Sequence, residues 1–107
     1  RLTALSNKLN VTGVTVFGDK GQSGEIEVRT FAPACGIEED PACGSGNGSV
    51  AAFRKHYKLL ERQETTYTAN QGQKVGRDGK IVIYYTEDGQ IILSASCITT
   101  VNGTINI

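Results

Sequence analysis

The sequence predicts an α+β domain with about six strands, one short helix and one longer helix. Two segments, near residues 1–10 and 50–60, repeat apolar residues at helical spacing. Most of the remaining chain consists of short runs rich in valine, isoleucine, threonine and tyrosine, and Asp88-Gly89 and Asn102-Gly103 are strong hairpin turns. At 107 residues the chain has the size of one domain, so residues 1–107 are treated as a single domain.

The first forty residues contain one predicted helix and two predicted strands. Leucines at positions 2, 5 and 9 predict a short amphipathic helix over residues 1–10. Residues 11–19 and 25–33 are predicted to be strands. Three glycines between them predict a loop or hairpin turn at residues 18–25. Residues 34–40 are expected to be a connector.

The longer helix is predicted from an apolar stripe that starts at residue 50 and has a charged face opposite it. The stripe comprises Val50, Phe53, Tyr57 and Leu60. The side chains expected to be solvated are Arg54, Lys55, Lys58 and Glu61. Four further strands are predicted after this helix, at residues 65–72, 80–86, 90–96 and 98–107.

Charge and hydropathy exclude several classes of function. Eleven basic and eleven acidic residues cancel and form no block of like charge, so neither nucleic acid nor a membrane surface is an expected partner. No apolar run approaches the roughly 18 residues of a membrane span, and no signal peptide opens the chain. A soluble, cytoplasmic protein is therefore expected.

The cysteines, Cys35, Cys43 and Cys97, are too few and too irregularly spaced to predict a disulfide framework or a zinc site. A small, odd number of cysteines is typical of a reducing compartment such as the cytoplasm. Cys35 and Cys97 are expected to be packing residues. The single histidine, His56, is expected to be a surface or half-buried residue of the longer helix.

The candidate site is the segment Asp40–Gly46, with the sequence DPACGSG. The start of a helix presents unpaired N–H groups and a partial positive charge, which together bind anions. Gly44 and Gly46 leave room for a carboxylate or phosphate to approach those N–H groups. Ser45 and Asn47 can add hydrogen bonds from their side chains.

Two residues of this segment are candidates for proton chemistry. A thiolate is stabilised at a helix start, so Cys43 is a candidate base or nucleophile, and Asp40 is a candidate proton carrier. Structural roles are equally open from the residues alone. Asp40 followed by Pro41 is also a good pair for capping and starting a helix. Cys43 can be a small buried side chain, and the glycines can serve close packing.

Several motifs resemble a known family. The order R-x-F-x-P, G-x-x-E-D-P-A-x-G-S, Q-G and G-R resembles the carboxy-terminal lobe of the phenazine-biosynthesis PhzF-like isomerases, over nearly the whole chain. The residues that carry the resemblance are Arg29, Phe31, Pro33, Gly36, Glu39-Asp40-Pro41-Ala42, Gly44-Ser45, Gln71-Gly72 and Gly76-Arg77.

The resemblance implies a lobe of the diaminopimelate-epimerase fold, in which a mixed, barrel-like sheet surrounds one central helix. It implies that residues 1–107 are the carboxy-terminal lobe of a two-lobe protein, and that the central helix of each lobe points its start into a shared cleft. The partners then expected are the missing amino-terminal lobe and a small carboxylated metabolite. An exposed face between lobes also makes a homodimer possible.

The function implied is an isomerase that moves protons without a metal or organic cofactor. The resemblance places the main base, a glutamate, on the lobe that is absent here. Asp40 would assist the proton transfer, and the Gly44-Ser45 region would hold the substrate. The isolated lobe is expected to be inactive, because the cleft is open to water and the opposing base is missing.

Cys43 stands where these isomerases commonly have threonine. The segment therefore also resembles the P-C-G-T-G and A-C-G-T-G motifs of related racemases and epimerases, in which this cysteine is one of two catalytic thiols. A two-thiol racemase or epimerase that uses Cys43 is the alternative enzyme hypothesis. A non-catalytic domain that binds small anions is the third hypothesis.

Overall fold

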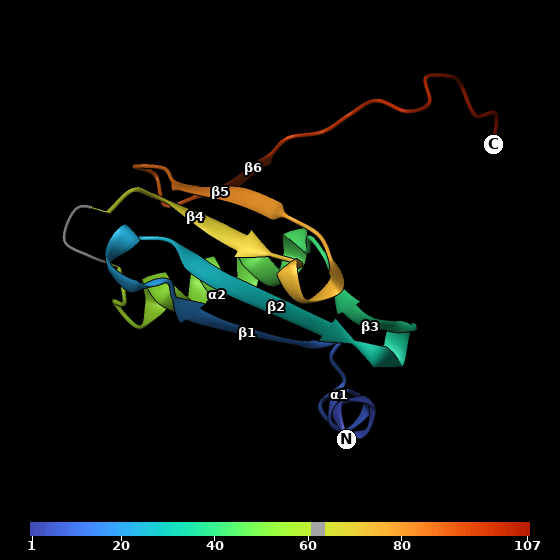
Figure 1. The fold of residues 1–107 in the computed structure, drawn as a ribbon, viewed down its shortest axis with the longest axis horizontal. Coiled ribbons are helices and arrows are strands. Elements are labelled where there is room, and N and C mark those ends of the chain that lie inside the picture. Colours follow the sequence, from blue (N-terminus) through green and yellow to red (C-terminus); the bar gives the residue numbers. More distant parts are fainter. Residues whose placement is uncertain (61–63) are drawn as a thin grey trace.

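The computed structural model describes residues 1–60 and 64–107 and has an α+β architecture. One mixed sheet of six strands carries the long helix α2 against one of its faces, and the short helix α1 lies at the end of the sheet (Figure 1). The elements are α1 (Leu2–Leu9), β1 (Val14–Asp19), β2 (Ile26–Ala32), β3 (Ile37–Asp40), α2 (Gly44–His56), β4 (Thr66–Gln71), β5 (Gly79–Tyr85) and β6 (Ile91–Ala95). Both predicted helices and five of the six predicted strands are thus confirmed.

The strand order is β1-β2-β4-β5-β6, and β3 pairs with β2 beside this path. Among the paired strands of residues 1–60 and 64–107, only β2 and β4 run parallel, because the chain crosses between them through β3 and α2. Four strand spacings separate β1 from β6, so these two strands would lie about 19 Å apart if the sheet were flat. Helix α2 still contacts both edge strands, so the sheet curves around it. The described strands form an open sheet that ends at β1 and β6, and the barrel-like closure expected from the sequence is not seen among them.

Two strand predictions are wrong. Residues 98–107 form no strand, because their backbone pairs with no neighbour (Figure 1). Conversely, the predicted connector 34–40 contains strand β3, which pairs with β2 opposite Thr30 and Ala32. The number of strands matches the expectation only because one strand was missed and another does not form.

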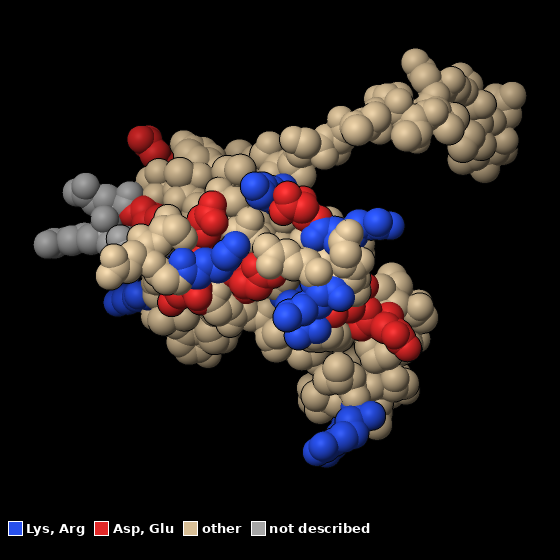
Figure 2. Space-filling view, viewed as in Figure 1, with Lys and Arg blue, Asp and Glu red and all other residues tan. Residues whose placement is uncertain are grey.

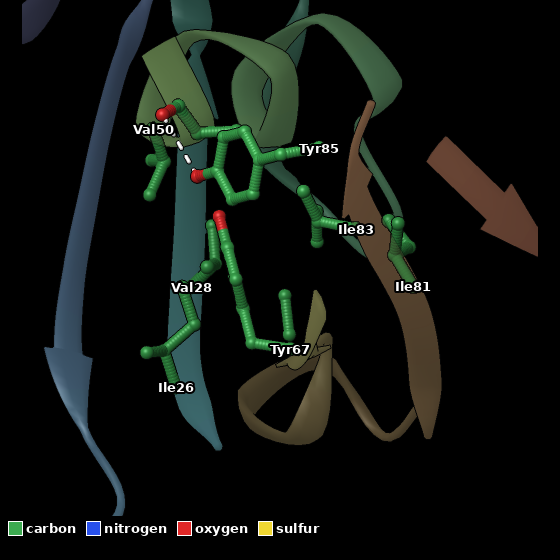
Figure 3. Close-up of a cluster of buried hydrophobic side chains, with 9 residues drawn as sticks. Ile26, Val28, Val50, Tyr67, Ile81, Ile83 and Tyr85 are labelled. Carbon is green, nitrogen blue, oxygen red and sulfur yellow. Dashed lines mark hydrogen bonds between the residues drawn. The ribbon is translucent and has the colours of Figure 1, made fainter. Parts of the chain in front are cut away.

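The core lies between α2 and the inner face of the sheet (Figure 3). Strands β2, β4 and β5 contribute alternate residues to it, which is the pattern of a sheet with one buried face. The buried hydrophobic residues are Ile26, Val28, Val50, Ala51, Tyr67, Ala69, Ile81, Ile83 and Tyr85. No helix in the described part of the chain is long and apolar enough to cross a membrane.

The apolar stripe predicted for the long helix is only partly buried: Val50 lies in the core and Leu60 packs against it, whereas Phe53 and Tyr57 do not belong to the buried face. Phe53 is 47% exposed and Tyr57 is 59% exposed. The side chains that α2 buries are Gly46, Asn47, Val50, Ala51 and Arg54. Small residues on this face let the helix approach the sheet closely, and Phe53 packs at the margin against Phe17, with 5.9 Å between ring centroids.

Arg54, expected to be solvated, is only 6% exposed. Its guanidinium lies 4.2 Å from the centroid of the Tyr67 ring and 3.9 Å from a carboxylate oxygen of Glu64. A buried arginine with an aromatic and an acidic neighbour is compensated for its lost hydration. Lys55 and Lys58 are exposed as expected, and Glu61 lies outside the described residues.

Tyr85 ties α2 to the sheet. Its hydroxyl donates a hydrogen bond of 2.9 Å to the carbonyl of Ala51, drawn as the dashed line in Figure 3. Burial raises the pKa of this hydroxyl well above its usual value. We expect Tyr85→Phe to lower the free energy of unfolding by about 1 kcal/mol, because one buried hydrogen bond is lost.

Urea unfolding followed by circular dichroism measures this difference. Tyr84→Phe is the matched control, because Tyr84 is the preceding residue of the same strand and is exposed. Equal unfolding midpoints for the two variants would contradict the assignment.

Candidate functional site

Helix α2 starts at Gly44 and is capped by the thiol of Cys43, whose Sγ accepts a hydrogen bond of 3.3 Å from the N–H of Gly46. Asp40 is therefore not the cap, which corrects the structural role expected for that residue. It ends β3, and its Oδ1 accepts a hydrogen bond of 2.9 Å from the N–H of Ala42. Serine, threonine, aspartate and asparagine are the usual caps, so residue preference alone favours Asp40 over Cys43.

Two buried amide side chains hold the segment between β3 and α2. Gln71 donates a hydrogen bond of 2.6 Å to the carbonyl of Asp40, and its Oε1 accepts one of 3.3 Å from the N–H of Cys43. Asn47 donates to the carbonyl of Cys43 and to Gln71 Oε1, both at 2.8 Å. Asn47, expected to offer hydrogen bonds to a ligand, is instead buried and bonded within the protein. Together the two amides fix residues 40–43.

The glycines of the segment have different roles. Gly44 is exposed, and a Cβ built there would meet no atom within 4 Å, so it leaves the helix start open. Gly46 is buried, and a Cβ there would lie 2.6 Å from Thr30 Oγ1 and 2.8 Å from Thr15 Oγ1. The close-packing role therefore applies to Gly46, which lets α2 approach β1 and β2.

Four of the five predicted site residues line one hollow of about 410 Å³: Asp40, Cys43, Ser45 and Gly46. Gly44 lines a second hollow of about 460 Å³ on the other side of the helix start. Cys43 Sγ lies 3.5 Å from Ser45 Oγ. Helix geometry gives the N–H groups of Gly44 and Ser45 no acceptor within the helix.

Other residues of the first hollow were missed by sequence reasoning. Thr15 on β1 and Thr30 on β2 face each other there, with 3.0 Å between their hydroxyl oxygens. No motif marks these threonines, because only strand pairing brings them together. Cys35 also lines this hollow and is exposed, so its expected packing role is wrong. Cys97 is exposed as well, and the packing role expected for it is likewise wrong.

The strand that carries Asp40 is held by an ion pair. Arg29 on β2 donates two hydrogen bonds of 2.8 Å to the carboxylate of Glu39 on β3. Its guanidinium also lies 4.9 Å from the centroid of the Phe31 ring. The hydrogen bonds from Arg29 hold the pKa of Glu39 below its usual range. The pair thus fastens β3 to β2 at the residue next to Asp40.

This ion pair makes stability dependent on pH. The pKa of Glu39 is lower in the folded chain than in the unfolded chain. The ion pair therefore stabilises the fold at pH values above the unfolded-state pKa, and this stabilisation is lost as the pH falls through the folded-state pKa. We expect Glu39→Gln to be less stable than the parent chain at neutral pH, and the difference to shrink in acid. Urea unfolding at a series of pH values measures it. The control is Glu38→Gln, on the exposed neighbouring residue. If the difference in free energy of unfolding between Glu39→Gln and the parent chain stayed constant with pH, the ion pair would not be the source of the pH dependence.

The described residues contain no group of three or more His, Cys, Asp or Glu side chains that could hold a metal ion.

Comparison with known proteins adds to this geometry. A family model described as Phenazine biosynthesis-like protein, PhzC-PhzF, matches residues 1–101. The chain belongs to the PhzC-PhzF family. The resemblance on which the sequence interpretation depends is therefore confirmed.

Several curated relatives of the PhzC-PhzF chain are named isomerases. The uncharacterized isomerase YddE of Escherichia coli (strain K12) is 36% identical over 87 residues, which cover 79% of this chain and 29% of the relative. An uncharacterized isomerase of Clostridium acetobutylicum is 36% identical over 86 residues, which cover 77% of this chain and 28% of the relative. A Schizosaccharomyces pombe protein named Antisense-enhancing sequence 1 is 42% identical over 69 residues, 61% of this chain and 21% of the relative. The PhzC-PhzF chain thus spans less than a third of the length of these relatives.

Proposed function

We propose that the chain is the carboxy-terminal lobe of a PhzF-like isomerase, and that the hollow at the start of α2 is half of its active site. The observation that carries the proposal is the convergence of the Asp40 carboxylate, the Cys43 thiol and Ser45, in the first turn of α2, on one hollow of about 410 Å³. That volume suits a small molecule. The helix start favours a negatively charged one.

The proposed chemistry is proton transfer on a small carboxylated metabolite. The N–H groups of Gly44 and Ser45, together with Ser45 Oγ, bind the substrate carboxylate. Asp40 uses Oδ1 to hold the N–H of Ala42, which leaves Oδ2 to give or take a proton at the substrate. The opposing base belongs to the missing amino-terminal lobe, which also excludes water from the site. No step requires a metal or organic cofactor.

The test uses the complete two-lobe protein in D₂O with candidate carboxylated substrates. The expected product carries solvent deuterium at the isomerised carbon, as mass spectrometry or NMR would show. The 107-residue chain assayed alone should give no product. Product without deuterium would refute proton exchange with solvent, and turnover by the 107-residue chain would refute the need for a second lobe.

A second candidate is a racemase or epimerase that uses two thiols, with Cys43 as one of them. The observation that favours it is the position of the Cys43 thiol. This thiol lines the hollow and accepts a hydrogen bond from the N–H of Gly46 at the helix start. Cys35 and Cys97 are more exposed than Cys43, so exposure alone predicts that they react first with iodoacetamide. Faster labelling of Cys43 with loss of activity would support this candidate. Full activity of Cys43→Thr would eliminate it.

A further inference from the structure

Two threonine hydroxyls line the same hollow as Asp40 and Cys43 without a part in the chemistry proposed above. Thr15 on β1 and Thr30 on β2 are directly opposite each other in the strand register, and both line this hollow of about 410 Å³. Their hydroxyl oxygens lie 3.0 Å apart, at the distance of a hydrogen bond that either of them could donate. The question is which hydroxyl donates, because the other then keeps a proton that it can offer elsewhere.

The missing side chain of Gly46 leaves both hydroxyls facing the start of α2. A Cβ built on Gly46 would lie 2.6 Å from Thr30 Oγ1, 2.8 Å from Thr15 Oγ1 and 3.2 Å from Cys43 Sγ. Because one point lies this close to all three atoms, the threonine hydroxyls are near the Cys43 sulfur, which is itself 3.5 Å from Ser45 Oγ. A molecule of a few carbon atoms can therefore contact Ser45 and the threonine pair at the same time.

Burial determines the direction of the hydrogen bond between the two threonines. Thr30 is 6% exposed, whereas Thr15 is only half-buried. A hydroxyl donates one proton and can accept a hydrogen bond at the same time. If Thr15 donated, the proton of Thr30 would be buried, and the described part of the chain gives Thr30 Oγ1 no other hydrogen-bond partner. A buried donor without an acceptor is unfavourable, so Thr30 donates to Thr15.

The hydroxyl proton of Thr15 then points into the hollow. Among the residues that the structure describes, Thr15 Oγ1 has no acceptor apart from Thr30, which is its own donor. A hydroxyl that accepts one hydrogen bond is polarised and becomes a stronger donor of another. An oxygen atom of a bound molecule would satisfy this donor.

The charge of the hollow determines which kind of oxygen fits. Of the described residues that line it, Asp40 is acidic, and none is lysine, arginine or histidine. On the face drawn in Figure 2, acidic and basic side chains are interspersed. A second carboxylate of the bound molecule would thus meet a like charge and no cation on this side of the site, which is unfavourable. An uncharged oxygen, in a hydroxyl or carbonyl group, suits the Thr15 donor.

We infer that Thr15 determines substrate specificity, because its hydroxyl donates a hydrogen bond to an uncharged oxygen of the substrate while the start of α2 binds the substrate carboxylate. Thr30 is a positioning residue that orients this hydroxyl. The substrate class is a small acid with one carboxylate on this side of the site and a hydroxyl or carbonyl oxygen a few bonds away. This inference rests on the proposed function, since it takes the hollow as the substrate site.

The test compares two probes, 3-hydroxypropanoate and butanoate, in which a hydroxyl replaces a methyl group of the same size. Each is titrated into the complete two-lobe protein, and ligand-observed NMR gives its dissociation constant. We expect 3-hydroxypropanoate to bind about 3- to 10-fold more tightly, the usual gain from one hydrogen bond. Equal affinities would overturn the role of Thr15 and leave the carboxylate site in place. If neither acid bound, the proposed carboxylate site would fail, and the inference would fail with it.

Variants of the two threonines identify the donor. Thr15→Val keeps the shape of the side chain and removes the hydroxyl, so the preference for 3-hydroxypropanoate should vanish, whereas Thr15→Ser should keep it. Thr30→Val is the matched control and should retain a smaller preference, because Thr15 keeps its own proton. A purely structural role of the pair would lower the thermal midpoint of both valine variants and leave the ratio of the two affinities unchanged, which would overturn the inference. A preference kept in Thr15→Val and lost in Thr30→Val would also overturn it.

Discussion

Replacing Asp40 with asparagine in the complete two-lobe protein is expected to lower kcat by about 10²- to 10⁴-fold, the usual contribution of a positioned acid or base. Asparagine has nearly the same shape, and its Oδ1 can still accept the N–H of Ala42, so residues 40–43 keep their conformation. What is lost is a group that can give or take a proton. Steady-state kinetics and the thermal midpoint of the same sample measure the two effects separately.

The matched control for this prediction is Asp78→Asn. Asp78 is an exposed carboxylate that lines the hollow on the other side of the helix start, so its loss changes local charge without removing the proposed proton carrier. An Asp40→Asn enzyme with unchanged kcat and unchanged thermal midpoint would remove Asp40 from the mechanism. An equal loss of kcat in both variants would assign the effect to charge alone.

Replacing Gly72 with alanine is expected to cost about 2–5 kcal/mol of folding free energy. The φ of Gly72 is +89°, a conformation that costs an ordinary residue about 1–2 kcal/mol. The added Cβ would also lie 2.7 Å from the carbonyl oxygen of Pro41, and an overpacked site typically costs about 1–3 kcal/mol. Since Pro41 directly follows Asp40, the same change should displace the candidate site.

Two neighbouring glycines separate these contributions. Gly76 has φ of +72° and open space around it, so Gly76→Ala measures the conformational cost alone. At Gly79 a Cβ would lie 2.7 Å from the Pro41 oxygen without a positive φ, so Gly79→Ala measures the collision alone. Urea unfolding of the three variants should rank Gly72→Ala as the least stable. If Gly72→Ala were as stable as Gly76→Ala, the Pro41 carbonyl could move away from the added Cβ without a measurable loss of folding free energy.

The local sequence pattern predicted most strands of the sheet, but not all of them. Strands β1, β2, β4, β5 and β6 have the alternation and turn residues that single out a strand. Strand β3 consists of an isoleucine and three acids, so propensity alone does not favour it, and only pairing with β2 defines it. Residues 98–107 are the opposite case, because strong strand propensity without a partner produces no strand.

The sequence predicted that a helix starts at the glycine-rich segment, but not how the residues around that start contact one another. The glycine-rich segment identified the helix start, because so many glycines are unfavourable inside a helix. The thiol cap follows from how the chain enters α2, and cysteine is not among the preferred caps. The contact between Asn47 and Gln71 joins residues 24 positions apart through buried side chains. No local rule predicts such a pair.

The two buried amides of Asn47 and Gln71 have a mechanical consequence. They connect residues 40–43 to α2 and β4, so this short stretch cannot move as a flap without breaking several partly buried hydrogen bonds. Residues 40–43 therefore form a fixed side of the candidate site, and they do not themselves move to enclose a bound molecule. The start of α2 is a rigid surface. Any adjustment to the shape of a bound molecule then has to come from the part of the protein that faces it.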